Sequence, residues 1–145
     1  MQDENYLLRL SLLEQNMQRL QEQFAALEQQ RAEMIALGES IKKIKGAKGR
    51  EILAHIGKGI FLRAEASCND ELVVDVGSRV FIKKDIEGTE KIIEGQIDEL
   101  ENAKSSLLAE LLKEKSEAED IILEIDKRRK ESAKKFGEEN RERKA

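Results

Sequence analysis

Apolar residues recur every three or four positions in two long stretches of the chain, the spacing of heptad positions a and d. In the first stretch these positions hold Tyr6, Leu10, Leu13, Met17, Leu20, Phe24, Leu27, Met34 and Ile41. In the second stretch they hold Ile93, Ile97, Leu100, Leu107, Leu111, Ala118, Ile121 and Ile125. Because heptads sustained over this length favour a helix packed against another helix, the pattern predicts one helix over about 4–45 and a second over 85–140.

The segment between the two periodic stretches, residues 51–84, is rich in β-branched residues that alternate with polar ones, as in strands. Gly57-Lys58-Gly59 and Gly77-Ser78 mark two tight turns inside it, so we expect two β-hairpins. Gly46–Gly49 is expected to end the first helix, and Asp85 to be the N-cap of the second. The predicted fold class is mostly α with a small β part, a long antiparallel coiled-coil hairpin with two β-hairpins at its bend.

The predicted β-hairpins need partners that a single chain does not provide. A two-stranded hairpin is marginally stable in water, and these carry apolar residues on both faces in places. Their outer edges also have unpaired backbone groups that can pair with further strands. We therefore expect strands of other subunits to cover them, so that the whole chain, 1–145, is one subunit of an assembly.

Composition favours long solvated helices, because charged residues make up 39% of the 145 residues and aromatic residues only 3%. The net charge of −4 argues against general nucleic-acid binding. A single cysteine, Cys68, cannot form an internal disulfide and fits a reducing cytosol, so a cytoplasmic location is expected. We see neither a secretory leader nor the ~20 continuous apolar residues of a membrane span, and expect no membrane partner.

No group of residues in the sequence has the spacing of a catalytic site. His55, the only histidine, has no second His or Cys at ligand spacing, so no metal is expected. Gly57-Lys58-Gly59 lacks the length and the following Lys-Ser/Thr of a phosphate-binding loop, so no nucleotide cofactor is expected. Cys68 is best interpreted as a passive loop thiol. The chain is therefore predicted to have no catalytic residues and not to be an enzyme.

At two places, apolar residues also occupy heptad positions other than a and d, and an antiparallel pairing of the helices brings these two places together. If the numbers of paired residues add up to about 130, residue 8 lies near residue 122. A third helix or a broader stripe would bury the surplus residues; otherwise they form an exposed apolar patch, which usually marks a binding site. We call the contact between the two helices, made by the a and d residues, the seam. The residues predicted to contact non-native client chains include neighbours of the surplus residues on the seam, and they are Tyr6, Leu7, Leu8, Leu10, Leu12, Leu13, Ile121, Ile122, Leu123 and Ile125.

The last residues, 127–145, differ in charge from the rest of the chain. They hold nine Lys or Arg and four Glu, a local charge of +5, which leaves −9 for the remainder. A solvated tail that frays is the first interpretation; contact of Lys127–Lys130 and Lys134-Lys135 with an acidic partner is the alternative. A leucine-zipper DNA binder is disfavoured, because there the basic region precedes the heptads.

The middle region resembles a known family. Residues Gly57 to Glu65 and Glu71 to Asp85 resemble the G-x-G-x-F…VxVG…(E/K)KD pattern of prefoldin alpha subunits. A coiled coil, two hairpins and a coiled coil form the plan of that family, and two hairpins match its alpha class, whereas beta subunits have one. The family usually has Val-Pro before the first glycine turn, where Ala54-His55 stands here, and this departure leaves the architecture untouched.

The resemblance implies a hexamer of two alpha and four beta subunits with a double β-barrel body and six protruding coiled coils. It also implies an ATP-independent holdase chaperone that captures unfolded polypeptides with its apolar tips and delivers them to a group II chaperonin. By matching position, the residues of the intersubunit barrel would be Ile60, Leu62, Ala64, Leu72, Val74, Val76, Val80 and Ile82. The alternative is a prefoldin-like scaffold or filament-forming subunit that assembles through the same hairpins.

Overall fold

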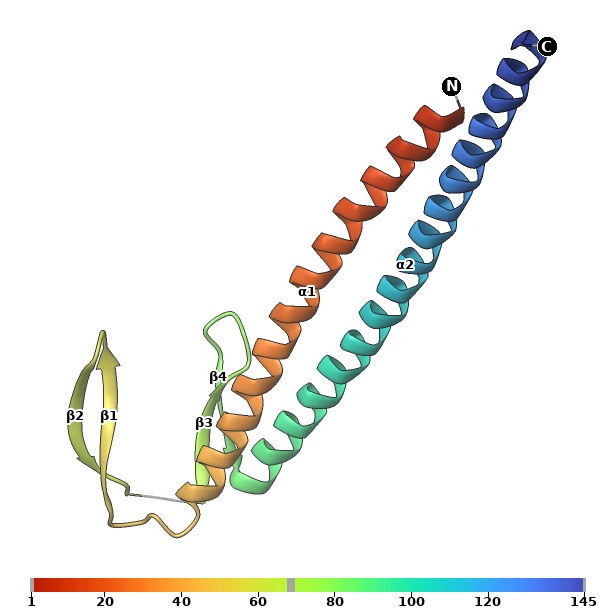
Figure 1. Cartoon of the computed structure of the whole chain (residues 1–145). Helices are drawn as coiled ribbons and strands as arrows, with labels where there is room; N and C mark the ends of the chain where they lie inside the picture. The colour runs from red at the N-terminus through yellow and green to blue at the C-terminus, as the bar shows by residue number, and fades with distance from the viewer. Residues whose placement is uncertain (1, 68–69, 145) are drawn as a thin grey trace. The chain divides into compact units, whose positions relative to one another are not determined.

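The computed structural model describes residues 2–67 and 70–144, and within these it contains two helices and four strands (Figure 1). The elements, in chain order, are α1 (Gln2–Ile44), β1 (Glu51–Gly57), β2 (Ile60–Glu65), β3 (Glu71–Asp75), β4 (Phe81–Asp85) and α2 (Ile86–Lys144). The predicted fold class, two long helices with two β-hairpins between them, is confirmed. Cys68 lies outside the described residues, so its interpretation as a passive thiol stays a prediction.

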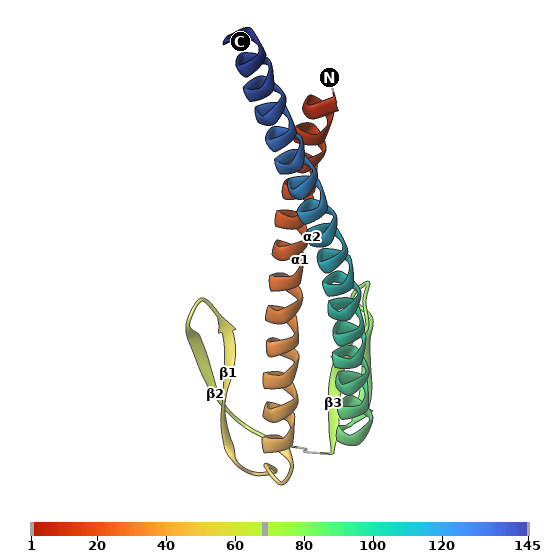
Figure 2. The same ribbon diagram turned by 45° about the vertical axis from the view of Figure 1, so that its right-hand side comes forward.

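The chain forms two compact units, and each contains a part of both helices. The first unit consists of Met1–Leu27 and Ala103–Ala145, and the second of Glu28–Asn102. In the first unit Leu13 of α1 is buried with Ala118 and Ile121 of α2. Since low numbers on α1 pack against high numbers on α2, the two helix segments run antiparallel, as the heptad pattern predicts (Figure 2).

The second unit has a core cluster of its own where α1 ends and α2 begins. Ile41 of α1 is buried with Ile86 and Ile93 of α2, and these helix segments are again antiparallel. Leu72 of β3 packs against the same cluster. One strand of the second hairpin is therefore anchored on the helical seam by an apolar side chain.

The four strands form two separate antiparallel sheets of two strands each, β1–β2 and β3–β4. In the first hairpin Ala54 pairs with Leu62, and in the second Val74 pairs with Ile82. The second hairpin turns at Ser78 and Arg79, whose positive φ angles of 52° and 59° give the turn that matches strand twist. The two hairpins expected from the glycine turns are thus confirmed.

Local signals set the ends of both helices. After α1, Gly46 adopts a φ of 78°, the left-handed conformation that glycine takes without steric cost. At the start of α2 the Asp85 carboxylate accepts a hydrogen bond of 2.8 Å from the Gly88 amide, which has no partner within the helix. Both ends are as the sequence predicts. The structure has residues 127–144 within α2, and their fraying in solution stays a prediction.

Neither described helix has a stretch that is apolar enough over a sufficient length to cross a membrane. The helical surface away from the seam is dominated by Glu, Lys and Arg, as expected for solvated helices.

The cap at Asp85 is testable by substitution. Asp85→Ala is expected to lower the free energy of unfolding by about 1 kcal/mol, because the Gly88 amide loses its acceptor. Asp85→Ser is the control, since a serine oxygen accepts the same bond and should retain most of the stability. Urea unfolding followed by circular dichroism measures both variants, and equal losses would contradict the cap.

Candidate functional site

Five large apolar side chains at the end of the first unit where α1 begins are exposed, and we call them together the tip patch: Leu7, Leu8, Leu12, Ile122 and Leu123. Each is between 51% and 67% exposed, although each is a large hydrophobic residue. They occupy heptad positions outside the a and d stripe, so the packing of α1 on α2 leaves them in solvent. Within the described chain no third helix covers them. The first unit therefore offers apolar surface of the kind that marks binding sites.

The other predicted contact residues hold the two helices together. Leu13 and Ile121 are buried, and Tyr6, Leu10 and Ile125 pack around them partly buried. Their burial leaves the five residues of the tip patch as the exposed part of the predicted set.

Polar contacts fasten the two helices beside the tip patch. The Arg128 guanidinium donates hydrogen bonds to Gln2 at 3.0 Å and Asp3 at 3.5 Å, and it lies 4.9 Å from the ring centre of Tyr6. One helical turn earlier, Glu124 accepts a further bond from Arg128 at 3.3 Å. Arg128 thus ties the start of α1 to α2.

The environment of Arg128 keeps it fully charged. Partial desolvation lowers the pKa of Arg128, but the hydrogen bonds to Glu124 and Asp3 and the favourable field of Tyr6 outweigh it, so that the pKa is raised.

Arg9 makes a second link between the helices, with its Nε donating to Glu117 at 2.8 Å.

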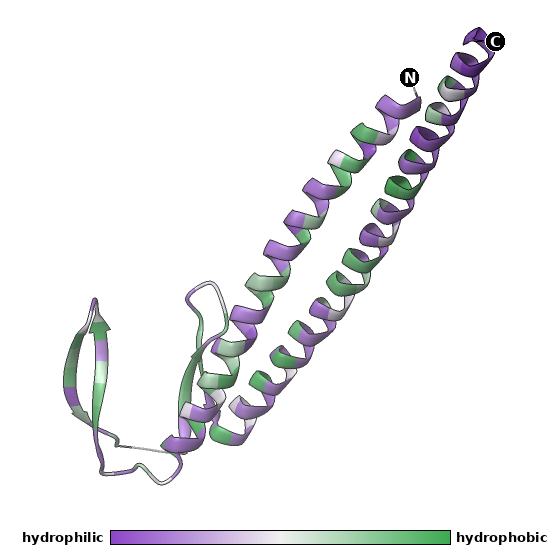
Figure 3. Cartoon of the chain, viewed as in Figure 1, coloured by the Kyte–Doolittle hydropathy of each residue, from purple (hydrophilic) through white to green (hydrophobic). Residues whose placement is uncertain are grey.

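The β-hairpins carry a second exposed apolar surface. Of the residues that the sequence assigns to a subunit interface, Ile60, Leu62, Val76 and Val80 are between 52% and 62% exposed. The others are partly buried within this chain: Ala64, Leu72, Val74 and Ile82. Figure 3 shows both hairpins with long hydrophobic stretches (green), which the single chain leaves in contact with water.

Several exposed apolar residues of the hairpins were missing from the predicted set: Leu53, Ile56, Phe61, Val73 and Phe81. In the first hairpin Leu53 pairs with Arg63, on the face opposite to Leu62, so both faces carry large apolar side chains. The sequence predicts apolar residues on both faces in places, but the predicted interface set was taken from one face of each strand. The available signal was the presence of aliphatic or aromatic residues at consecutive strand positions, which indicates burial on both sides.

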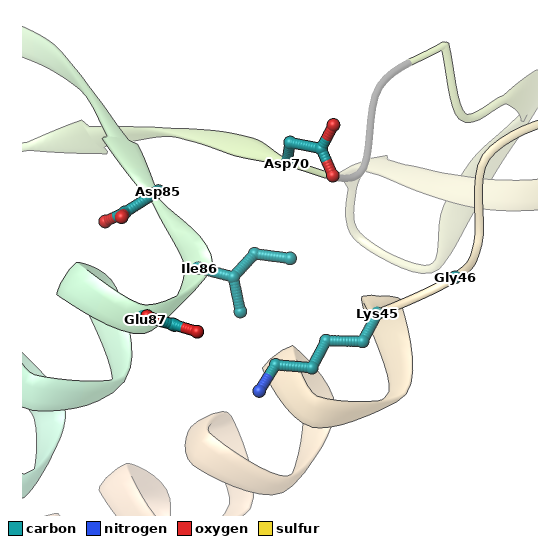
Figure 4. Close-up of a pocket in the computed structure, with 6 residues that line it drawn as sticks. All are labelled: Lys45, Gly46, Asp70, Asp85, Ile86 and Glu87. Atoms are coloured by element: carbon teal, nitrogen blue, oxygen red, sulfur yellow. The ribbon is translucent and has the colours of Figure 1, made fainter.

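A hollow of about 450 Å³ lies where α1 ends and α2 begins, lined by Lys45, Gly46, Asp70, Asp85, Ile86 and Glu87 (Figure 4). Two of its charged groups have structural partners. The Asp85 carboxylate caps α2, and the Lys45 ammonium forms a 3.0 Å ion pair with Glu90. These two groups therefore serve the fold at this end of the helices.

No chemistry of a metal or catalytic site is visible in the described part of the chain. Among its residues, no three His, Cys, Asp or Glu side chains gather closely enough to hold a metal ion. His55 contacts Phe61 across the first hairpin in an edge-on arrangement, with ring centres 5.2 Å apart. The two apolar surfaces, the tip patch and the hairpins, are thus the candidate functional sites.

A family model described as prefoldin subunit matches residues 13–138, which include most of both helices and all of both hairpins. The chain belongs to the prefoldin family. This assignment gives it a chaperone-type role, and it explains why apolar surfaces and not reactive groups are its distinctive features.

The similar curated prefoldins are alpha subunits of archaea, which confirms the class that the sequence resembles. Prefoldin subunit alpha of Methanococcus vannielii is 28% identical over 125 residues, which cover 86% of this chain and 84% of that protein. Prefoldin subunit alpha of Methanosphaera stadtmanae is 34% identical over 91 residues, which cover 63% of this chain and 65% of that protein.

A solved structure of filamentous prefoldin from Methanocaldococcus jannaschii, determined by cryo-electron microscopy, has a similar fold. The TM-score is 0.53 at 24% sequence identity, and the match covers 84% of this chain and 96% of the solved one. At this identity the likeness concerns the fold, and it agrees with the arrangement of helices and hairpins described above.

Replacement of a leucine of α1 by alanine is expected to change stability by different amounts in the seam and in the tip patch. Leu13→Ala is expected to cost about 2–5 kcal/mol of unfolding free energy, because it leaves a cavity between the helices. Leu8→Ala should change stability by less than about 0.5 kcal/mol, since Leu8 is 62% exposed. Urea unfolding of both variants measures the difference, and equal costs would show that Leu8 is buried in solution.

Proposed function

We propose that the chain is the alpha-type subunit of a cytoplasmic prefoldin hexamer, with two alpha and four beta subunits, that acts as an ATP-independent holdase. The tip patch is the observation that carries this proposal: five large apolar residues stand exposed on a helix pair that has no need of them for its own packing. The membership of the prefoldin family supports the chaperone part of the proposal. In this reading the chain is not an enzyme and needs no cofactor.

Capture of a client follows from the physical character of the tip patch. An unfolded polypeptide exposes apolar side chains, and contact with Leu7, Leu8 and Leu12 removes apolar surface of both partners from water. One such contact is weak, because each exposed leucine contributes at most about 1.5–3 kcal/mol when fully buried. Several arms that act on one client raise the effective concentration of tips, and avidity then provides retention without ATP.

Assembly of the hexamer requires that the hairpins be covered. The outer edges of β1–β2 and β3–β4 have unpaired backbone groups, and Phe61 and Phe81 are more than half exposed. Strands of beta-type subunits that continue these sheets into an intersubunit barrel would satisfy the edges and bury the aromatic rings. We propose further that the assembled arms deliver clients to a group II chaperonin.

The holdase proposal is tested by suppression of aggregation. The chain, assembled with a beta-type subunit and without nucleotide, should keep a chemically denatured protein soluble. The triple variant Leu7→Ser, Leu8→Ser, Leu12→Ser should lose most of this protection. Light scattering of the client protein after dilution from denaturant measures its aggregation, and hence the protection.

A matched control separates the tip patch from general surface hydrophobicity. Leu37, Leu108 and Leu112 are also exposed leucines, between 45% and 56%, but they lie outside the tip patch. Their replacement by serine should leave protection intact. Equal loss in both triple variants, or protection that survives the tip variant, would refute capture by the tip patch.

A structural scaffold or filament is the second candidate function. The exposed faces of both hairpins favour it, because their edges can pair with strands of like chains as well as unlike ones. The solved relative from Methanocaldococcus jannaschii is described as filamentous, and its likeness to this chain extends to the fold.

Electron microscopy distinguishes the two candidates. The chain mixed with a beta-type subunit is expected to form closed particles of uniform size, because a closed barrel leaves no edges for growth. Long fibres in this mixture would favour the scaffold and contradict the hexamer.

A further inference from the structure

The C-terminal part of α2 carries its charges on two distinct faces. On a helix with 3.6 residues per turn, all four acidic residues of 127–144 fall within an arc of about 100°: Glu131, Glu138, Glu139 and Glu142. Seven of the nine basic residues fall on the remaining side: Lys127, Arg129, Lys130, Lys134, Arg141, Arg143 and Lys144. We call the second side the basic face.

The basic face continues from the tip patch along the same side of α2. Ile122 and Leu123, the α2 members of the tip patch, project into the same arc as Arg129 and Lys130, two turns further on. Phe136 projects there as well and is 68% exposed. Along this side of the helix, over about 30 Å from residue 122 to residue 144, Ile122 and Leu123 come first, Asp126 follows and pairs with Lys130, and the remaining cations surround Phe136.

The contacts within the chain leave most of these cations unused. In the part of the chain that the structure describes, no carboxylate forms an ion pair with Arg129, Lys134 or Arg141. Lys130 is the exception, with a 3.5 Å pair to Asp126 on the preceding turn. All residues from Arg129 to Lys144 are exposed, and Figures 1 and 2 show this end of α2 (dark blue) extending past the start of α1.

We propose that the basic face extends the tip patch and selects a class of client, unfolded polypeptides in which apolar residues are interspersed with Asp and Glu. This inference rests on the proposed holdase function. Apolar side chains of the client contact Leu123 and Phe136, and its carboxylates approach the cations between them. Charge complementarity identifies the client chemistry, because the basic face has no acidic residue from Lys127 to Lys144.

The same face argues against two other classes of partner. An interfacial membrane helix buries a broad apolar face, whereas from residue 127 onward Phe136 is the only large apolar residue here. A nucleic-acid helix is less suited too, since four glutamates follow the same helix on its other side and the chain carries a net charge of −4. The polypeptide client is therefore the partner that the side chains favour.

The test uses the full chain assembled with a beta-type subunit and three labelled peptides with identical leucine positions. The residues between the leucines are Glu in the first peptide, Gln in the second and Lys in the third. The Glu peptide should bind about three- to tenfold more tightly than the Gln peptide, and the Lys peptide more weakly, by fluorescence anisotropy. At 1 M salt, where screening acts over about 3 Å, this order should vanish while leucine-dependent binding remains.

Two adjacent lysines provide a matched pair of variants. Lys134 lies on the basic face and Lys135 among the glutamates, so Lys134→Glu and Lys135→Glu change the net charge equally on different faces. Lys134→Glu should weaken binding of the Glu peptide about threefold or more, and Lys135→Glu should have less effect. Phe136→Ser should weaken the binding of all three peptides to a similar extent.

The outcomes separate this inference from the holdase proposal. Binding of all three peptides with equal affinity would overturn the selection of acidic clients and leave capture by the tip patch standing. Binding of none would overturn both. Equal effects of Lys134→Glu and Lys135→Glu, or tighter binding of anionic vesicles or duplex DNA than of the Glu peptide, would also overturn the role of the basic face.

Discussion

Burial of a narrow apolar stripe between two antiparallel helix segments is the interaction on which the rest of this chain depends. In each unit three side chains are buried at the centre of the seam, Leu13 with Ala118 and Ile121, and Ile41 with Ile86 and Ile93. A two-helix seam uses only two positions of each heptad. Apolar residues outside those positions therefore stay in water unless another chain covers them, and this constraint leaves the five residues of the tip patch exposed.

The two hairpins relate differently to this seam. The second hairpin is anchored on it through Leu72, so one of its faces is already occupied by the helices of its own chain. The first hairpin has exposed apolar residues on both faces, with Leu62 on one and Leu53 on the other. An assembly must therefore cover the second hairpin on one face and the first on two. The first hairpin depends more on partners, since a lone two-stranded sheet is marginal in water.

Features that depend on short-range geometry could be predicted from the sequence. The helices follow from the three- and four-residue spacing, and the cap at Asp85 and the stop at Gly46 follow from side-chain chemistry at single positions. The tip patch could be located because Leu8 and Leu123 occupy heptad positions that a two-helix seam leaves open.

Features that depend on tertiary pairing were beyond sequence reasoning. Where a segment has many apolar residues, the heptad pattern alone does not show which of them stay exposed after the helices pack. Leu13 and Ile121 were therefore grouped with exposed neighbours, although both are buried between the helices. The contacts of Arg128 with Gln2 and Asp3 require the register between the helices, which no local pattern specifies. The predicted interface set leaves out Phe61, which is exposed, because an isolated hairpin gives no sign of which face a partner covers.

Ion pairs across the helices do not fix that register by themselves. An apolar seam with heptad spacing tolerates a slip of seven residues, because each a or d side chain then meets another of similar character. Such a slip would part Arg9 from Glu117 and Arg31 from Glu101, but it would bring Arg9 opposite another glutamate, Glu110 or Glu124. Exposed pairs of this kind also add little stability, about 0–1 kcal/mol each, so the register depends more on how the apolar residues pack, such as Leu13 against Ala118 and Ile121. In the first unit this packing sets the start of α1 against the part of α2 that contains Ala118 and Ile121, so the exposed leucines of α1 and the exposed Ile122 and Leu123 lie in the same part of the helix pair.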